Sequence, residues 1–166
     1  MPKTRKQQSM AGALILAVIA GVVIGVVLYN PLDTPPPGPA KVEIVGEYDD
    51  SWGRLKTKVA KATVTHILVS WTGANPRSQP KEPRSKDEAR KLIDQLWLQF
   101  RNNPTEGNWR KMQAQFNEDS QPHTPYEVDR NASLVQPFKD CSMSTEINHA
   151  RVVESEFGFH LIRREK

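Results

Sequence analysis

The sequence predicts an α+β domain that is preceded by a single transmembrane helix. Three features indicate this: an uninterrupted apolar run near the N-terminus, a strand-like segment followed by two amphipathic helix patterns, and two strand-like segments near the C-terminus. A strand, then helices, then strands are typical of one sheet with helices packed against it. A chain of 166 residues has room for one domain and an anchor, since domains commonly contain about 100–150 residues.

The charge of the chain is concentrated before the apolar run. Lys3, Arg5 and Lys6 supply three of the four net positive charges, and no acidic residue precedes Asp33. The remainder is nearly neutral, whereas nucleic-acid binding requires clustered Lys and Arg side chains that neutralise phosphates. We therefore expect no nucleic-acid partner.

Residues 11–29, AGALILAVIAGVVIGVVLY, contain no charged side chain. As a helix this run is about 28 Å long, which matches the hydrocarbon core of a bilayer. A cleaved signal peptide is the alternative, but its apolar region is usually only about 7–15 residues long and ends in small residues. The positive-inside rule then places residues 1–10 in the cytoplasm as a basic tail, and the rest of the chain on the exported side.

Small residues recur every fourth position along the apolar run, at Ala17, Gly21 and Gly25. Such a stripe allows close approach of a transmembrane helix partner. Glycine and alanine are also common in membrane helices, so both interpretations stay open. Residues 30–40 are rich in proline, which favours an extended spacer over a ligand for an aromatic groove.

Residues 41–62 form a juxtamembrane segment that changes from acidic to basic around Trp52. The sequence assigns it no firm structure: it could pack on the following domain, bind a partner or lie near lipid head groups. Residues 63–70 are rich in β-branched side chains and predict a first strand, in which His66 and Leu68 share a face. A loop rich in glycine and proline follows, over residues 72–84.

Two helices are predicted after this loop. Ser85 and Glu88 have the spacing of a capping box, and apolar residues recur at helical spacing until Asn102-Asn103-Pro104. Thr105 is expected to cap the second helix, whose inner face would contain Trp109, Met112 and Phe116. Residues 126–129 and an apolar piece at 134–141 follow, and then two strands, 150–154 and 158–163. The single cysteine, Cys141, excludes an intramolecular disulfide and a Cys-based zinc site, so we expect a buried apolar role.

The order of several short motifs resembles that of parvulin-type peptidyl-prolyl isomerases. They are Thr-His-Ile-Leu-Val at 65–69, Ser-Lys-Asp-Glu-Ala at 85–89, Asn-Trp at 108–109, Gln-Phe-Asn-Glu-Asp-Ser at 115–120, Val-Gln-Pro-Phe at 135–138 and Phe-Gly-Phe-His-Leu-Ile at 157–162. The resemblance covers residues 63–166 and implies a four-stranded antiparallel sheet surrounded by helices. It also implies a proline pocket on the concave face of the sheet, with no cofactor and no metal.

The resemblance implies that His66 and His160 form a paired hydrogen-bonding element at the base of this pocket, and that Asp119 lies beside the reacting bond. From the residues alone, a histidine in a strand is as readily a core residue. Three arginine and lysine residues in the 72–84 loop, Arg77, Lys81 and Arg84, lie where some parvulins carry a basic cluster for acidic or phosphorylated substrates. Glu82 interrupts them here, which favours a solvated loop.

The resemblance further implies that Leu134 and Phe138 bind the proline ring and that Ser155 supplies a hydroxyl near His160. One segment departs from the family. Parvulins usually have Gly-Asp-Leu-Gly where this chain has Thr124-Pro125-Tyr126-Glu127, so Tyr126 replaces a pocket leucine and is expected to narrow or reshape the substrate site.

These features predict a membrane-anchored peptidyl-prolyl cis-trans isomerase that acts on proline-containing polypeptides and assists folding of exported or membrane proteins. Its domain would lie in the periplasm or another extracytoplasmic space. Two alternatives stay open: a catalytically degenerate structural or assembly subunit of a membrane protein complex, and a periplasmic holdase chaperone.

Overall fold

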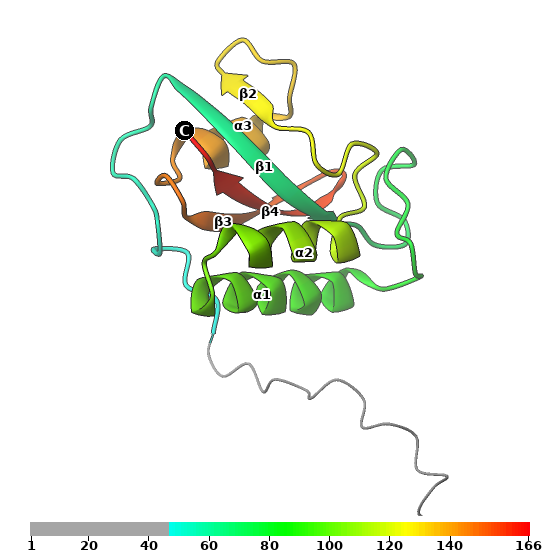
Figure 1. Cartoon of the computed structure of the whole chain (residues 1–166). Helices are drawn as coiled ribbons and strands as arrows, with labels where there is room; N and C mark the ends of the chain where they lie inside the picture. The colour runs from blue at the N-terminus through cyan, green and yellow to red at the C-terminus, as the bar shows by residue number, and fades with distance from the viewer. Residues whose placement is uncertain (1–46) are drawn as a thin grey trace, which may run out of the picture. The chain divides into compact units, whose positions relative to one another are not determined.

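The centre of the fold is a pair of antiparallel strands that lie far apart in the sequence. The computed structural model describes residues 47–166, in which β1 (Lys61–Val69) pairs with β4 (Gly158–Arg164) (Figure 1). Strand β2 (Tyr126–Asp129) joins the other edge of β1, and β3 (Ala150–Ser155) joins β4. The order is β2-β1-β4-β3 with every neighbouring pair antiparallel, which confirms the predicted α+β fold and its four-stranded sheet.

Three predicted parts of the chain lie outside the described residues. They are the basic tail (1–10), the apolar run with its small-residue stripe (11–29) and the proline-rich linker (30–40). Within residues 47–166, none of the helices combines the length and the apolar character needed to cross a bilayer.

Both predicted helix starts are confirmed. Helix α1 (Lys86–Asn102) begins at a complete capping box, because Ser85 Oγ accepts a hydrogen bond from the Glu88 N–H and the Glu88 carboxylate accepts one from the Ser85 N–H. Helix α2 (Glu106–Phe116) begins after Thr105, whose hydroxyl oxygen accepts a hydrogen bond from the backbone of Asn108. These local bonds satisfy N–H groups that have no partner inside the helix.

Most of the apolar piece at 134–141 belongs to a third helix, which was not assigned from the sequence. Helix α3 (Gln136–Met143) has Pro137 in its first turn, where the missing N–H costs no intrahelical hydrogen bond. Phe138 and Cys141 of this helix are buried against the sheet, so Cys141 has the expected apolar surroundings.

Alternation along the strands divides the domain into two cores. Ile67 and Val69 of β1 face the core beneath α1 and α2, together with Trp97. Val64 of β1 and Ile162 of β4 face the opposite core, beneath α3. Successive strand side chains point to opposite faces, so even-numbered residues of β1 and β4 share the α3 side. Both predicted histidines therefore lie on this face of the sheet.

Residues 47–60 pack on the domain, which was one of three possibilities for the segment 41–62. The rings of Tyr48 and Trp52 lie 5.0 and 5.7 Å from that of Trp97, both edge-on. Asp50 accepts a hydrogen bond of 2.8 Å from the buried Arg151. This segment leads directly into β1, which begins at Lys61, before the expected start at residue 63.

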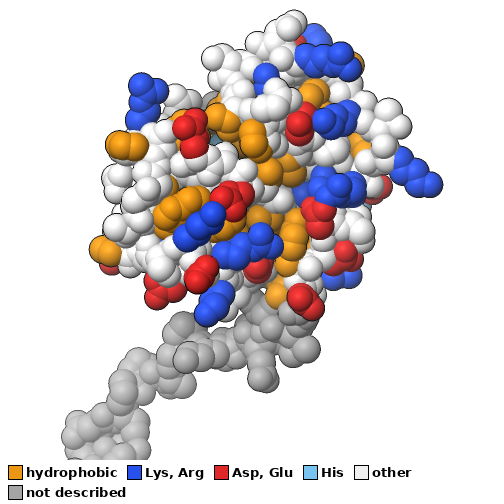
Figure 2. All heavy atoms as spheres, turned by 180° about the vertical axis from the view of Figure 1, so that it is seen from behind, with side chains coloured by type: hydrophobic (Ala, Val, Ile, Leu, Met, Phe, Trp, Pro, Cys, Tyr) orange, Lys and Arg blue, Asp and Glu red, His pale blue; other side chains and the backbone are white. Residues whose placement is uncertain are grey.

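The surface seen from behind the view of Figure 1 has mixed charge. Figure 2 shows Lys and Arg side chains interspersed with Asp and Glu on this face, with apolar side chains between them. A surface of this kind has no extended area of one sign to steer a highly charged partner.

The packing of residues 47–60 leads to a stability prediction at Gly53. Its φ is +71°, and a Cβ there would lie 2.3 Å from the Cβ of His149. We expect Gly53→Ala to lower the free energy of unfolding by about 2–4 kcal/mol, through backbone strain and this overlap. Urea denaturation of the two full-length proteins measures the difference.

Gly73→Ala is the matched control, because Gly73 also has a positive φ of +90° but open space around its Cβ position. Here we expect a loss of only about 1 kcal/mol, from the backbone conformation alone. Equal losses for the two variants would contradict tight packing of residues 47–60 against the domain.

Candidate active site

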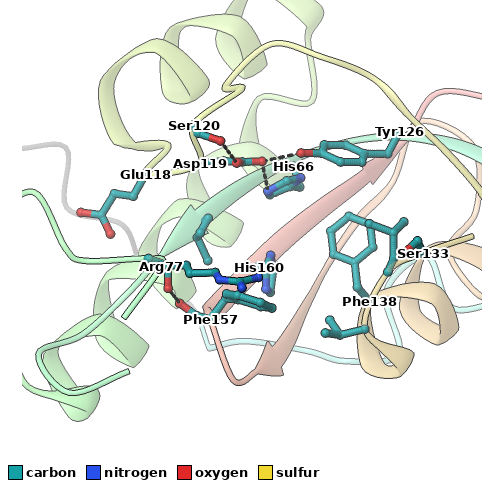
Figure 3. A pocket seen from close by; sticks show the side chains of 14 residues that line it. His66, Arg77, Glu118, Asp119, Ser120, Tyr126, Ser133, Phe138, Phe157 and His160 are labelled. Atoms are coloured by element: carbon teal, nitrogen blue, oxygen red, sulfur yellow. Dashed lines mark hydrogen bonds and ion pairs between the residues drawn. The ribbon is translucent and has the colours of Figure 1, made fainter. Parts of the chain in front are cut away.

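A cavity of about 590 Å³ lies over the sheet at the site predicted for substrate (Figure 3). This volume falls in the range typical of ligand sites. The sheet, helix α3 and four loops form its wall, through His66, Leu68, Arg77, Ser78, Glu118, Asp119, Ser120, Tyr126, Ser133, Leu134, Val135, Phe138, Phe157 and His160.

Antiparallel pairing of β1 with β4 places the two histidines side by side. His66 lies opposite Ile162 and His160 lies opposite Leu68, so the two imidazoles are diagonal neighbours on one face. Their ring centroids are 5.3 Å apart, and only 6% and 5% of the two residues are exposed. Within the described part of the chain, the Nδ1 atoms of both rings lack a hydrogen-bond partner.

Asp119 reaches this pair because Asn117 fixes the loop after α2. The Asn117 side chain accepts a hydrogen bond from the Leu68 N–H at 2.8 Å and donates to the carbonyls of His66 and Pro122, both at 3.0 Å. The loop is thus tied to the middle of β1. As a result, Asp119 Oδ2 lies 3.2 Å from His66 Nε2.

The Asp119 carboxylate is the acceptor of several hydrogen bonds. His66 Nε2 donates to Oδ2, and the Tyr126 hydroxyl donates to the same oxygen at 2.7 Å. These bonds, that with His66 above all, hold the pKa of Asp119 well below its usual range, although partial burial acts in the opposite direction. Asp119 is therefore ionised at neutral pH. Burial and the neighbouring carboxylate raise the pKa of Tyr126, which keeps its hydroxyl protonated.

His160 is held in its neutral form. Its Nε2 lies 2.7 Å from Ser155 Oγ, which also accepts a hydrogen bond from the backbone of Phe157. Burial above all, and also the proximity of His66, lowers the pKa of His160 to about 3. Ser155 itself is buried beside His160 and does not line the cavity.

Aromatic side chains form the apolar part of the wall. Phe138 of α3 contacts both histidines edge-on, with ring centroids 5.2 Å from His66 and 5.3 Å from His160. The ring centroid of Tyr126 lies 5.9 Å from that of Phe138 and 5.3 Å from that of His66, so this ring belongs to the same cluster. Leu134 extends this wall and is only partly buried, which leaves it accessible from the cavity.

The three basic residues of the 72–84 loop lie in different surroundings. Arg84 donates hydrogen bonds to both oxygens of Glu118 and to the Ser70 carbonyl, so it is not a solvated residue as expected. Lys81 is exposed, and its backbone N–H donates to Glu118. Arg77 lines the cavity. The expected solvated loop is thus wrong for Arg84, because its guanidinium is needed to neutralise the buried Glu118 carboxylate.

The family model described as the PPIC-type PPIase domain matches residues 52–166 of this sequence. The chain belongs to the parvulin family. Family membership supports peptidyl-prolyl isomerase activity, and peptidyl-prolyl isomerases of this type act on proline-containing peptides. No curated protein matches the chain in sequence.

Solved parvulin structures have the same fold. The peptidyl-prolyl isomerase ESS1 from Candida albicans superposes with a TM-score of 0.56 at 12% identity, over 64% of this chain and 63% of that one. The PPIase domain of TbPAR42 superposes with a TM-score of 0.55 at 20% identity, over 63% of this chain and 99% of that one. TbPIN1 superposes with a TM-score of 0.53 at 16% identity, over 64% of this chain and 98% of that one. The parvulin domain here thus spans less than two thirds of the Candida protein.

The predicted site residues come together, apart from one difference in position. Six of the seven line the cavity: His66, Asp119, Tyr126, Leu134, Phe138 and His160. Ser155 contacts the site only through His160. Sequence reasoning missed the positioning role of Asn117, although it stands inside the motif at 115–120. Within residues 47–166, no group of His, Cys, Asp and Glu side chains is arranged to hold a metal ion.

The neutral, buried His160 predicts a pH dependence of stability. In the unfolded chain its pKa is about 6.5, whereas in the folded parvulin domain it is about 3. Between these values only the unfolded state binds the proton, so stability falls as pH decreases from 6.5 towards 3, by up to about 1.4 kcal/mol per pH unit. Urea unfolding at pH 7, 6, 5 and 4 measures this slope.

We expect His160→Asn to reduce the slope of stability against pH by up to the contribution of one proton, about 1.4 kcal/mol per pH unit. This expectation does not depend on how stable the variant is at pH 7. His123→Asn is the control, because His123 is exposed and does not line the cavity. If the His160 variant kept the slope of the unmodified protein, the neutral state of His160 would be refuted.

Proposed function

We propose that this chain is a membrane-anchored peptidyl-prolyl cis-trans isomerase acting on exported or membrane polypeptides. Rotation about an X-Pro bond breaks amide resonance and faces a barrier near 20 kcal/mol. The bonds of the chain stay intact, so the enzyme needs only to bind the twisted amide more tightly than either planar isomer. The observation that carries the proposal is the aromatic cavity over the two buried histidines and the ionised Asp119.

The apolar wall supplies the proline subsite. Phe138 and Leu134 would hold the pyrrolidine ring, and the ring of Tyr126 would close the pocket on the side of β2. Because the ring is held fixed, the preceding residue can rotate about the amide bond relative to it. Water is displaced from the same volume, which strengthens polar contacts to the amide.

The polar groups would act on the rotating carbonyl. His66 and His160 lie at the base of the cavity and Asp119 beside them, within reach of a peptide that fills it. We assign them the role of orienting the amide electrostatically, a function that requires groups held in place before the substrate twists. Asp119 has no role as a nucleophile in this proposal, because isomerisation involves no acyl transfer.

A matched pair of leucine variants tests the proline subsite. Leu134 and Leu92 are both partly buried, but Leu134 lines the cavity and Leu92 packs on the α1 core. We expect Leu134→Ala to lower kcat/KM for a proline-containing peptide by about tenfold, since it removes apolar contact with the substrate ring. Leu92→Ala should lower stability and leave kcat/KM within about twofold.

The assay on the unmodified full-length protein decides the proposal itself. Peptides that isomerise equally fast with and without the protein would exclude the enzymatic function. A holdase chaperone would then suppress aggregation of unfolded chains even after Leu134→Ala, and a structural subunit would copurify with membrane partners in fixed stoichiometry.

The anchor is the second part of the proposal, and the uncharged run at 11–29 supports it. The basic residues before this run favour a cytoplasmic N-terminus and an exported isomerase domain. We expect the full-length protein to stay in the membrane pellet after alkaline extraction. Replacing Ile19 and Val22 by arginine should release it, because each charge at the centre of a span costs about 2.5–3.5 kcal/mol.

The control is the pair Leu32→Arg and Ala40→Arg, both outside the run, which should leave the protein in the pellet. Release of the unmodified protein by alkaline extraction would refute the anchor without affecting the isomerase proposal.

A further inference from the structure

We propose that Tyr126 is a positioning residue whose hydroxyl holds the Asp119 carboxylate on His66, and so determines the hydrogen-bonding state of the histidine pair. This inference rests on the proposed isomerase function for its effect on turnover, but the arrangement itself is independent of activity. It gives a role to the residue at which the sequence departs from the family pattern.

The geometry around Asp119 favours this role over simple filling of space. Oδ2 accepts from the Tyr126 hydroxyl at 2.7 Å and from His66 Nε2 at 3.2 Å, so the tyrosine makes the shorter contact. The opposite oxygen has only longer contacts, at 3.3 Å with the Ser120 hydroxyl and 3.4 Å with the Gln121 N–H. Without the tyrosine hydroxyl, little else would prevent the carboxylate from turning away from His66.

The carboxylate in turn fixes the proton of His66. An ionised carboxylate only accepts hydrogen bonds, so His66 Nε2 must carry a proton. In a ring with that single proton, Nδ1 is an acceptor. On the other strand, Ser155 Oγ accepts the Phe157 N–H. We assign the Ser155 hydroxyl as the donor in its 2.7 Å contact with His160 Nε2. His160 then carries its proton on Nδ1. The two buried Nδ1 atoms therefore have complementary character, one acceptor and one donor.

The position of Tyr126 in the sheet makes its hydroxyl a fixed partner. Tyr126 is the first residue of β2 and pairs with Val64 of β1, so its backbone is held beside the strand that carries His66. Its ring contacts His66 and Phe138 and leaves only the terminal oxygen to reach Asp119. The ring shapes the pocket and the hydroxyl orients the carboxylate, and these two contributions can be separated by substitution.

Other titratable and charged groups line the same cavity as Asp119, from the surrounding elements. His66 lies on β1, His160 on β4, and Arg77 and Glu118 come from loops that line the cavity. Glu118 is neutralised by Arg84, and burial keeps His160 uncharged. Of these groups, only His66 is expected to change when the tyrosine oxygen is removed, and it does so through Asp119 itself. A change in the titration of Asp119 would therefore report the loss of the hydrogen bond from Tyr126.

The test compares Tyr126→Phe with Tyr48→Phe in the full-length protein. Tyr48 is a half-buried tyrosine that also donates to an aspartate, Asp50, but lies on the opposite core. In Tyr126→Phe we expect the carboxyl carbon of Asp119 to titrate about one pH unit higher, because a hydrogen bond to a charged group has been lost. Carbon-13 NMR measures the titration, and long-range nitrogen-15 spectra report which nitrogen of His66 carries the proton.

The His66 spectra should change from a single Nε2–H form to a mixture of tautomers in Tyr126→Phe alone. In the peptide assay, kcat/KM should fall about tenfold for Tyr126→Phe and stay within twofold for Tyr48→Phe. A double-mutant cycle excludes a general loss of packing: in an Asp119→Asn background, Tyr126→Phe should cause little further loss.

Unchanged titration of Asp119 and an unchanged His66 tautomer in Tyr126→Phe would overturn the positioning role, even if turnover fell. Additive losses in the cycle would overturn it as well. If both NMR signals shift as expected while the unmodified protein fails to catalyse isomerisation, the positioning role stands and the proposed function fails.

Discussion

The antiparallel pairing of β1 with β4 is the constraint on which the rest of the molecule depends. It brings together residues from the two ends of the domain and, because side chains alternate along a strand, separates an apolar face under α1 and α2 from a face that carries both histidines. A shift of one residue in this register would invert the faces of one strand relative to the other, so that His66 and His160 would no longer lie on the same face of the sheet. The buried side chains under α1 therefore stabilise the geometry of the site as well as the fold.

Burial of polar groups in the site is compensated by fixed partners from the loops. Asn117 satisfies the backbone of β1 and ties the Asp119 loop to it, and Arg84 neutralises Glu118 on the next residue of the same loop. A buried charge without such a partner would cost several kcal/mol. These contacts attach the loop after α2 to the sheet. Such attachment suits a site that acts by holding groups in place rather than by transferring them.

Local features were predictable from the sequence and tertiary ones were not. Helix starts at Ser85 and Thr105 depend on side chains only three residues away, so a short motif determines them. The roles of Asn117 and Arg84 depend on partners in other elements, which no local pattern specifies. Helix α3 was missed because a short apolar piece with an early proline has no clear period. The site residues were predicted by resemblance to the family, which carries this tertiary information implicitly.

The segment at Tyr126 shows how a departure from a family pattern can be absorbed by its surroundings. A phenol is larger and more polar than the leucine that the family resemblance leads one to expect at this position. The ring packs with Phe138 and the hydroxyl donates to Asp119, beside a cavity of about 590 Å³. A partly buried hydroxyl without a partner would be costly, and the Asp119 carboxylate supplies that partner. The two positions should therefore be considered together: the acid accounts for the tyrosine, and the tyrosine helps to keep the acid ionised beside His66.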